Sequence, residues 1–254
     1  MTATQIAAAL RHRILSGEFA YGSRMPNVRE LAEEYDVSQQ TAAAAYAALA
    51  GMGMVRTHRG KQGTVVAAGP PASAHLGTFG PYDVTAAAAW QPSAGQSGET
   101  VTTRVRQMTA TAAMAPWGIE EGSEVVERTR LRSVDGIPVQ HKVTVMPYEL
   151  AARRPAGYEG VPPMLAPIGA ARVDPPAGVR MADWLGWGTV RTESSITAEP
   201  MDAEAASALG LPEDVPGFRV VGISVDASGA TTFVTVTTAP LHHRITLDII
   251  EEPA

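Results

Sequence analysis

The sequence predicts an α+β fold in which a helical N-terminal domain precedes a domain built on an antiparallel sheet. In roughly the first 50 residues, apolar side chains recur every three to four positions, which is the period of amphipathic helices. From about residue 125 they alternate every second position between short turns, as in half-buried strands. The length of 254 residues allows two ordinary domains, each with its own core.

Two helices are predicted first. The inner face of the first consists of Ile6, Leu10 and Ile14. These residues are four positions apart, so they line one side of a helix that ends near Ser16-Gly17. Asn27, followed three residues later by Glu30, matches a capping box and predicts the start of a second helix over residues 28–35.

A third helix is predicted to begin after Ser38, whose hydroxyl can cap it, and to continue to about residue 50. Its predicted inner face consists of Ala42, Ala45, Tyr46 and Leu49. Two short strands follow, over residues 54–58 and 64–67, joined across Arg59-Gly-Lys-Gln-Gly63. Three helices with a two-stranded wing form a winged helix-turn-helix, whose third helix is placed to enter the major groove of DNA.

The charge distribution agrees with this prediction. The whole chain has a formal charge of −6, but residues 1–66 carry seven basic and five acidic side chains, or +2. The remainder carries 13 basic and 21 acidic side chains, or −8. A mildly basic domain attached to an acidic one is expected when the first meets phosphate and the second does not.

Composition excludes several other classes. The chain has no cysteine, which rules out disulfides and thiolate metal sites and fits a reducing cytoplasm. Neither a long apolar run nor a signal segment is present, so we expect a cytoplasmic protein with no membrane span. No nucleophile motif or phosphate-binding glycine loop occurs, and we expect neither an enzyme nor a cofactor.

The second half of the chain reads as strands. A strand over residues 125–134, a turn at Asp135-Gly136 and a strand over 138–146 form a hairpin. A helix over residues 202–209 precedes a second hairpin, whose strands span 217–225 and 231–238. The predicted domains are 1–67 and 101–254, joined by a linker over 68–100 that is rich in Gly, Pro, Ser and Ala.

Several fixed spacings give the N-terminal segment its resemblance to a known family. They are Ile14-Leu-Ser-Gly-Glu-Phe19, Arg29-Glu-Leu-Ala32, Val37-Ser38 with Thr41, and Gly60-Lys-Gln-Gly-Thr-Val-Val66. Together they resemble the GntR family of bacterial repressors. The resemblance implies that double-stranded DNA is the partner and that the contacts are made by Arg29, Ser38, Gln39, Gln40, Thr41, Arg59, Gly60 and Lys61. Where this chain has Gln39, the family commonly has arginine. Because glutamine reads adenine and arginine reads guanine, the operator cannot be copied from relatives.

Residues 101–250 resemble the UTRA effector domain of the HutC branch of this family, which has a chorismate lyase-like fold. The matching residues are Arg130-x-Arg-x-x-Asp-Gly-x-Pro138, Met146-Pro147, the run from Ala203 to Pro212, and the last hairpin. The resemblance implies that Arg130 and Arg132 hold an anionic group of a small effector. Two positions apart on a strand, they point to one face, where paired guanidinium groups suit phosphate or carboxylate.

Three features qualify the effector site. Arg128 continues the same row, and the alternative for all three arginines is the solvated face of a half-exposed strand. Lys142 stands where relatives often carry glutamate, which favours a more acidic ligand or a site that no longer binds the amino sugar usual in the family. The family's Ser-Leu-Tyr run is replaced by Pro162-Pro-Met-Leu165, and its late arginine-tyrosine pair by His242-His243-Arg244. These departures leave open either a different effector or a degenerate pocket.

The remaining candidates have simpler interpretations. His242-His243 lacks the spaced partners of a metal site, so surface or strand-end histidines are expected. Trp184 and Trp187 are expected to pack in a domain or dimer core.

Taken together, the residues and the two resemblances predict a homodimeric repressor that binds an inverted repeat and is released by a small acidic effector. The alternatives are a constitutive DNA-binding regulator with a degenerate pocket and, less favoured, a chorismate lyase-like enzyme.

Overall fold

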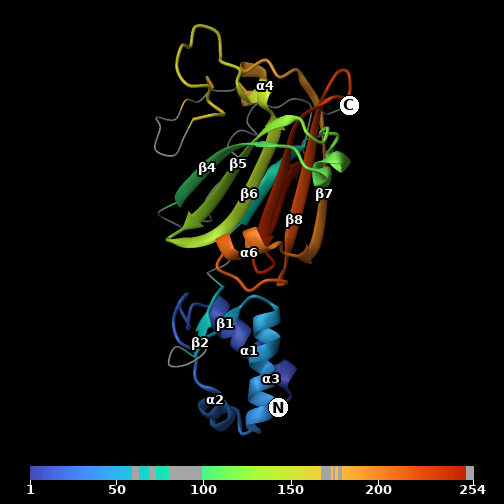
Figure 1. Ribbon diagram of the computed structural model, residues 1–254. Coiled ribbons are helices and arrows are strands. Elements are labelled where there is room, and N and C mark those ends of the chain that lie inside the picture. Colours follow the sequence, from blue (N-terminus) through green and yellow to red (C-terminus); the bar gives the residue numbers. More distant parts are fainter. Residues whose placement is uncertain are drawn as a thin grey trace, which may run out of the picture.

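The computed structural model describes residues 1–58, 63–68, 73–79, 99–166, 173, 175–176 and 179–249; for 73–79, 99 and 244–249 it describes the backbone alone. Figure 1 shows a helical N-terminal domain below a large antiparallel sheet, which confirms the predicted α+β class. Within the described residues, no helix is long and apolar enough to cross a membrane.

The three predicted helices are present as α1 (Ala3–Leu15), α2 (Val28–Tyr35) and α3 (Gln39–Gly51). Their predicted caps are also present. The Asn27 side chain accepts hydrogen bonds from the backbone of residues 29 and 30, and the Glu30 carboxylate accepts one from the Asn27 backbone at 2.8 Å. The Ser38 hydroxyl accepts a hydrogen bond from the Thr41 backbone at 3.1 Å, which begins α3.

The core of the N-terminal domain forms where α1 and α2 pack against α3. The four residues predicted for the inner face of α3 are buried, as are Ile6, Leu10, Ile14 and Leu31. The wing consists of β1 (Val55–Thr57) and β2 (Thr64–Val66), which pair antiparallel. The predicted winged helix-turn-helix is therefore confirmed, whereas residues 59–62 of the wing lie outside the described part of the chain.

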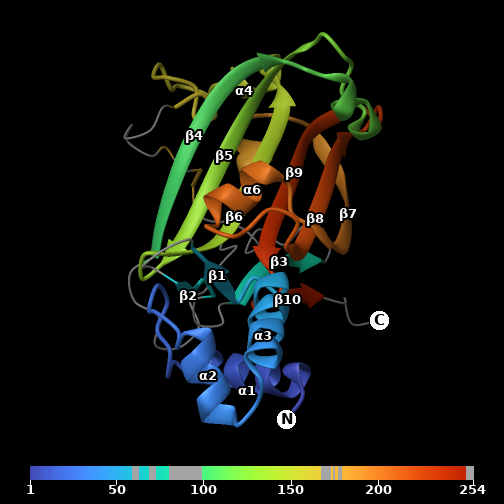
Figure 2. The same ribbon diagram turned by 60° about the horizontal axis from the view of Figure 1, so that its bottom comes forward.

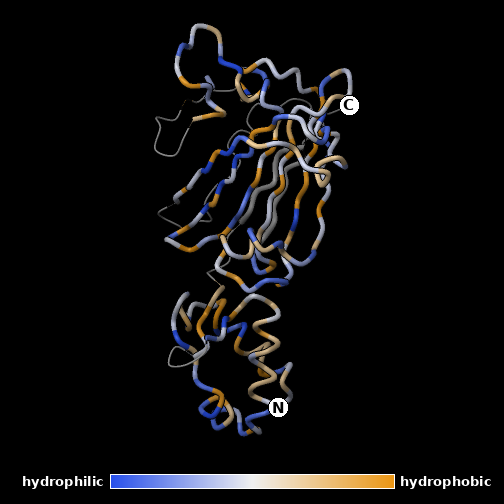
Figure 3. The backbone as a smooth tube through the Cα atoms, in the orientation of Figure 1, coloured by the Kyte–Doolittle hydropathy of each residue, from blue (hydrophilic) through white to orange (hydrophobic). Residues whose placement is uncertain are grey.

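The second domain is built on six antiparallel strands in the order β4-β5-β6-β9-β8-β7. Their bounds are β4 (Glu99–Thr109), β5 (Glu124–Val134), β6 (Ile137–Pro147), β7 (Thr189–Pro200), β8 (Pro216–Asp226) and β9 (Thr231–Pro240). Both predicted hairpins are confirmed. Asp135 and Gly136 both have positive φ in the first turn, as a tight two-residue hairpin requires. Hydrophilic and hydrophobic residues alternate along β4 and β5 in Figure 3.

The sheet has two differently covered faces. We call the face that carries Arg128, Arg130 and Arg132 the arginine face; α4 (Tyr148–Ala151) and α5 (Met181–Trp184) contribute to its core at one end. The opposite face carries α6 (Ala203–Ala208) at one end and η2 (Ala112–Trp117) at the other, and we call it the α6 face.

The range predicted to be a linker contains a strand. Within 68–100, β3 (Ser73–Phe79) pairs in parallel with β10 (Arg244–Ile249), near the C-terminus. In Figures 1 and 2 this pair lies on the side of the sheet away from α6, and the six-stranded sheet already begins with β4 at residue 99. The pairing joins segments more than 160 residues apart, which the local composition of the linker does not reveal.

The two domains meet where α6 and the loop after it face the N-terminal domain (Figure 2). Ala67 packs in one apolar cluster with Leu211 and Val215. Arg56 donates a hydrogen bond from Nη1 to the Gly210 carbonyl at 3.1 Å. The approach is close at Gly53, where an added Cβ would lie 2.8 Å from a methyl group of Val215. The segment that follows α6 is therefore in direct contact with the N-terminal domain.

Candidate functional site

The outer surface of α3 is the first candidate site. Gln39, Gln40, Ala43 and Ala47 are exposed on the side of the helix opposite its buried face. The Ser38 and Thr41 hydroxyls lie 2.9 Å apart and form the helix cap, so these two residues position the first turn. The structure thus presents two glutamine amides at the N-terminal end of the helix that a winged helix-turn-helix inserts into the major groove.

Arg29 lies on α2, and its side chain is 76% exposed. Its Nε donates to the Glu33 carboxylate at 3.0 Å, one helical turn away. Exposed pairs of this kind contribute little stability, so phosphate can replace the carboxylate at small cost. The wing residues predicted from the resemblance, Arg59, Gly60 and Lys61, lie outside the described residues.

The arginine face is the second candidate site. Arg130 is exposed and Arg132 is buried, and both project from β5 toward this face. Lys142 on β6 lies directly across from Arg130 in the strand register, while Gln140 lies across from Arg132. Burial lowers the pKa of Lys142, and the neighbouring Arg130 lowers it further. The structure therefore brings the three predicted effector residues together as one patch of positive charge.

Arg128 has a different role from its two neighbours. It is buried and donates from Nη1 to the Pro163 carbonyl at 2.8 Å. Burial lowers its pKa to about 10, with a further contribution from Arg130. The three arginines expected from the sequence are therefore not equivalent. Arg128 joins β5 to the segment that contains Pro163 through a hydrogen bond, whereas Arg130 is exposed.

The tryptophans pack as the sequence predicts. Trp187 is buried, donates from Nε1 to the Leu150 carbonyl at 3.0 Å and has its ring 5.4 Å from that of Phe233. Trp184 packs against the same cluster. These aromatic residues close one end of the arginine face and are core residues.

The sequence predicts a surface or strand-end position for the histidine pair, and the structure shows the second of these. The pair lies between β9 and β10, where His243 is only 5% exposed and its ring is 4.1 Å from that of His242. Burial lowers the pKa of His242 to about 4, with a smaller effect of Arg11 from the N-terminal domain. Burial also lowers the pKa of His243 to about 2, with His242 and Arg132 adding to the effect.

These pKa values predict acid sensitivity. Because both values lie below the unfolded value of about 6.5, the unfolded chain binds more protons as the pH falls. The contribution of the two neutral histidines to the free energy of unfolding is fully present above pH ~6.5. Below that pH each contribution declines by about 1.4 kcal/mol per pH unit, and the decline from His242 ends at about pH 4. Urea denaturation between pH 7 and 5 measures this slope. A double His242→Gln, His243→Gln variant should flatten it, and substitution of the exposed His12 should not. An equal slope in the double variant and the wild type would refute the assignment.

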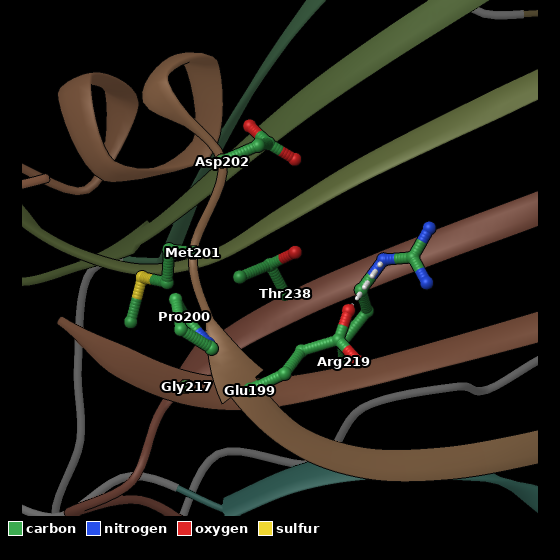
Figure 4. Close-up of a pocket in the computed structure, with 7 residues that line it drawn as sticks. All are labelled: Glu199, Pro200, Met201, Asp202, Gly217, Arg219 and Thr238. Atoms are coloured by element: carbon green, nitrogen blue, oxygen red, sulfur yellow. Dashed lines mark ion pairs between the residues drawn. The ribbon is translucent and has the colours of Figure 1, made fainter. Parts of the chain in front are cut away.

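Two cavities flank α6, and both lie on the α6 face. The one in Figure 4 has a volume of about 330 Å³ and is bordered by the end of β7 and by β8 and β9. An ion pair between Arg219 and Glu199, at 3.4 Å, crosses one side of it. The other, of about 320 Å³, lies between α6 and strands β4, β5 and β6, and His141 is among its lining residues. No residue predicted for the effector site lines either cavity. The first forms at the end of β7 beside β8 and β9, and the second where α6 packs on the sheet, so a local sequence pattern could not locate either.

Comparisons with known proteins agree with this architecture. Residues 2–66 match the model of bacterial regulatory proteins of the gntR family, and residues 93–157 match the UTRA domain model. An HTH-type transcriptional regulator of Rhizobium meliloti (strain 1021) is 25% identical over 229 residues, which cover 89% of this chain and 85% of the relative.

A solved structure shows the same fold. The crystal structure of a GntR-family transcriptional regulator covers 99% of this chain and 98% of its own, with 19% identity and a TM-score of 0.52. PhnF from Mycobacterium smegmatis is 24% identical, with 98% of this chain and 100% of PhnF covered and a TM-score of 0.46.

The winged helix-turn-helix and the six-stranded domain together define a transcriptional regulator with a DNA-binding domain and a UTRA effector-binding domain. Residues 2–66 therefore form a GntR-type DNA-binding domain and residues 93–157 match a UTRA domain, a combination that fits the HutC subfamily of GntR regulators.

Proposed function

We propose that the protein is a homodimeric repressor that leaves an inverted-repeat operator when a small acidic effector binds. Residues 1–67 would hold the DNA, residues 101–254 the effector and the dimer contact, and residues 68–100 would connect them. The observation that carries the effector assignment is the register of β5 and β6, which sets Lys142 directly opposite Arg130 and places Arg132 on the same face.

The charges of this patch support an acidic ligand. Like charges directly opposite each other on neighbouring strands destabilise a sheet, and a bound anion reverses that effect. Guanidinium groups can also bind phosphate or carboxylate in a bidentate geometry, which a lone ammonium cannot do. With Lys142 where relatives often have glutamate, the patch favours a ligand with more negative charge than the usual amino sugar.

The edge of the sheet supports the dimer. β7 is an edge strand of the six-stranded sheet, and Ile196 on it is 45% exposed. A long edge strand with exposed apolar side chains is suited to pairing with another strand, here that of a second copy. A symmetric dimer presents its two recognition helices with two-fold symmetry, which requires an inverted repeat.

Contact between the domains provides a route for coupling. The hydrogen bond from Arg56 to Gly210 and the close packing of Gly53 against Val215 connect the wing and the end of α3 with the loop after α6. If the junction has two arrangements that differ in DNA affinity, an effector that binds one of them more tightly shifts the protein toward it. The change in DNA affinity is then limited by the ratio of the effector's affinities for the two arrangements.

One observation favours the constitutive alternative. The two cavities that flank α6 lie on the α6 face, on the other side of the sheet from Arg130 and Arg132. If the arginine face binds no acidic molecule, the protein is a DNA-binding regulator whose original pocket has been lost. The relatives are transcription regulators, so we propose no enzymatic role.

The DNA-binding surface can be tested with a duplex selected from a random library by the full-length protein. Arg29→Ala should weaken binding by about 1–3 kcal/mol if the guanidinium reaches a base. Lys61→Ala should lower the slope of log affinity against log salt concentration by about one.

Gln39→Arg should shift a preferred adenine to guanine in the selected sites. Fluorescence anisotropy measures the affinities.

The matched control is Arg154→Ala, which removes an exposed arginine of the second domain and should leave DNA affinity unchanged. Unaltered affinity in Arg29→Ala and Lys61→Ala, together with the same selected sequences for Gln39→Arg, would rule out this surface.

A further inference from the structure

The cavity between α6 and the sheet has the features of a ligand site. Its volume of about 320 Å³ falls within the usual range of small-molecule pockets, roughly 300–1,000 Å³. Arg104 on β4, Thr129 on β5 and His141 on β6 line the sheet side, and Glu204 and Ser207 line the α6 side. This pocket is separated from Arg130 and Arg132 by the sheet itself.

Two residues that line this pocket each have a buried polar atom without a hydrogen-bond partner among the described residues. These atoms are Nε2 of His141 and Oγ1 of Thr129, and His141 as a whole is only 3% exposed. Buried polar groups in folded proteins are almost always hydrogen-bonded to protein, water or ligand. A molecule in the pocket is therefore expected to supply the missing partners.

The chemistry of the lining limits what that molecule can be. Burial lowers the pKa of His141 despite the opposing charge of Glu204, so the ring is neutral at neutral pH and Nε2 is either a donor or an acceptor. A hydroxyl group can partner the ring in either state, and it can also partner the Thr129 hydroxyl. Arg104 and Glu204 form an ion pair at 3.1 Å, which leaves the pocket without a net charge to attract an ion.

We propose that this pocket is a second ligand site, which binds a small neutral polyol through hydrogen bonds to His141 and Thr129. Leu131 and Ala208 supply apolar surface for the carbon atoms of such a molecule. Because α6 leads directly into the loop that packs on Gly53 and Ala67, a polyol in this site lies against the element that contacts the N-terminal domain. The site does not depend on the role proposed for the arginine face.

The test uses the full-length protein and four probes: glycerol, erythritol, xylitol and myo-inositol. Titration followed by the histidine ring signals in NMR spectra should show saturable shifts of His141 with at least one polyol. His141→Phe and Thr129→Val each remove a hydrogen-bonding group with little change of size. Each should weaken binding of that polyol by roughly tenfold or more, measured for all variants by calorimetric titration because the His141 variants lack the ring signal. His141→Gln keeps a donor and an acceptor and should bind within about threefold of wild type.

Controls separate the two faces of the sheet. Thr144→Val makes the same change on the arginine face and should leave polyol binding unaltered, as should Arg130→Ala. Succinate, a dianion, should not shift the His141 signals. If no polyol shifts His141, the pocket holds water only and the proposal is wrong. Equal binding by the wild type, Thr129→Val and either folded His141 variant would also overturn it, whatever the outcome at the arginine face.

Discussion

Leu49→Ala is expected to abolish DNA binding while leaving the effector-binding domain folded. Leu49 on α3 is fully buried in the core of the N-terminal domain. Deleting a buried leucine side chain costs about 2–5 kcal/mol, since the transfer free energy is lost and a cavity remains. A domain of fewer than 70 residues has little stability to spare, so a loss of this size unfolds a large fraction of it.

Two spectroscopic probes separate the domains. The four tryptophans are at positions 90, 117, 184 and 187, so tryptophan fluorescence monitors the second part of the chain. Far-ultraviolet circular dichroism monitors helix, most of which is in α1, α2 and α3. Leu49→Ala should lower the denaturation midpoint of the helical signal and not that of the fluorescence. Met52→Ala, at an exposed position just after α3, is the matched control and should change both by less than about 0.5 kcal/mol. Wild-type stability in Leu49→Ala would contradict the described core.

Substituting Arg130 or Arg132 should weaken the affinity of the protein for its effector. Losing a hydrogen bond to a charged partner costs on the order of 1.5–3 kcal/mol, or about ten- to a hundredfold in affinity, for Arg130→Ala or Arg132→Ala. Lys142→Glu should weaken binding of an acidic ligand further, because it brings a negative charge opposite Arg130. Effector-free DNA affinity should stay near normal, since these residues lie outside the N-terminal domain.

A thermal-shift screen of phosphorylated and carboxylated metabolites supplies the ligand, and calorimetric titration measures its affinity. Arg154→Ala removes an exposed arginine from the same domain and is the control for charge alone. Should the ligand bind the double arginine variant as tightly as the wild type, the effector site lies elsewhere. Should no acidic compound stabilise the wild type, the constitutive alternative gains support.

Local signals account for what the sequence could predict. The helix caps at Asn27 and Ser38 act within three residues. The turn at Asp135-Gly136 sets the register of its hairpin as far as Ser133, beyond which a bulge shifts the pairing by one residue. The placement of Arg130 and Arg132 on one face follows from the alternation of a strand alone. These features need no knowledge of distant segments.

Contacts between distant segments account for what it could not. Three features depend on residues far away in the chain: the pairing of β3 with β10, the burial of His243 and the hydrogen bond from Arg128 to the Pro163 carbonyl. The pocket under α6 depends on how a six-residue helix settles on three strands, and no side-chain spacing encodes that. His141 is one of several polar residues on β6. Only the fold shows that its side of the strand lies under α6, whereas Lys142 faces the arginine face.

The most direct measurement follows a fluorescently labelled operator duplex, bound to the full-length protein, by anisotropy as the acidic ligand is added. The wild type should release the duplex over the concentration range in which the ligand binds, and the duplex should weaken ligand binding by the same factor. The Arg130→Ala, Arg132→Ala double variant should keep the duplex bound over that range. Retention of the duplex by wild-type protein saturated with the ligand would contradict the account, as would equal release from the double variant.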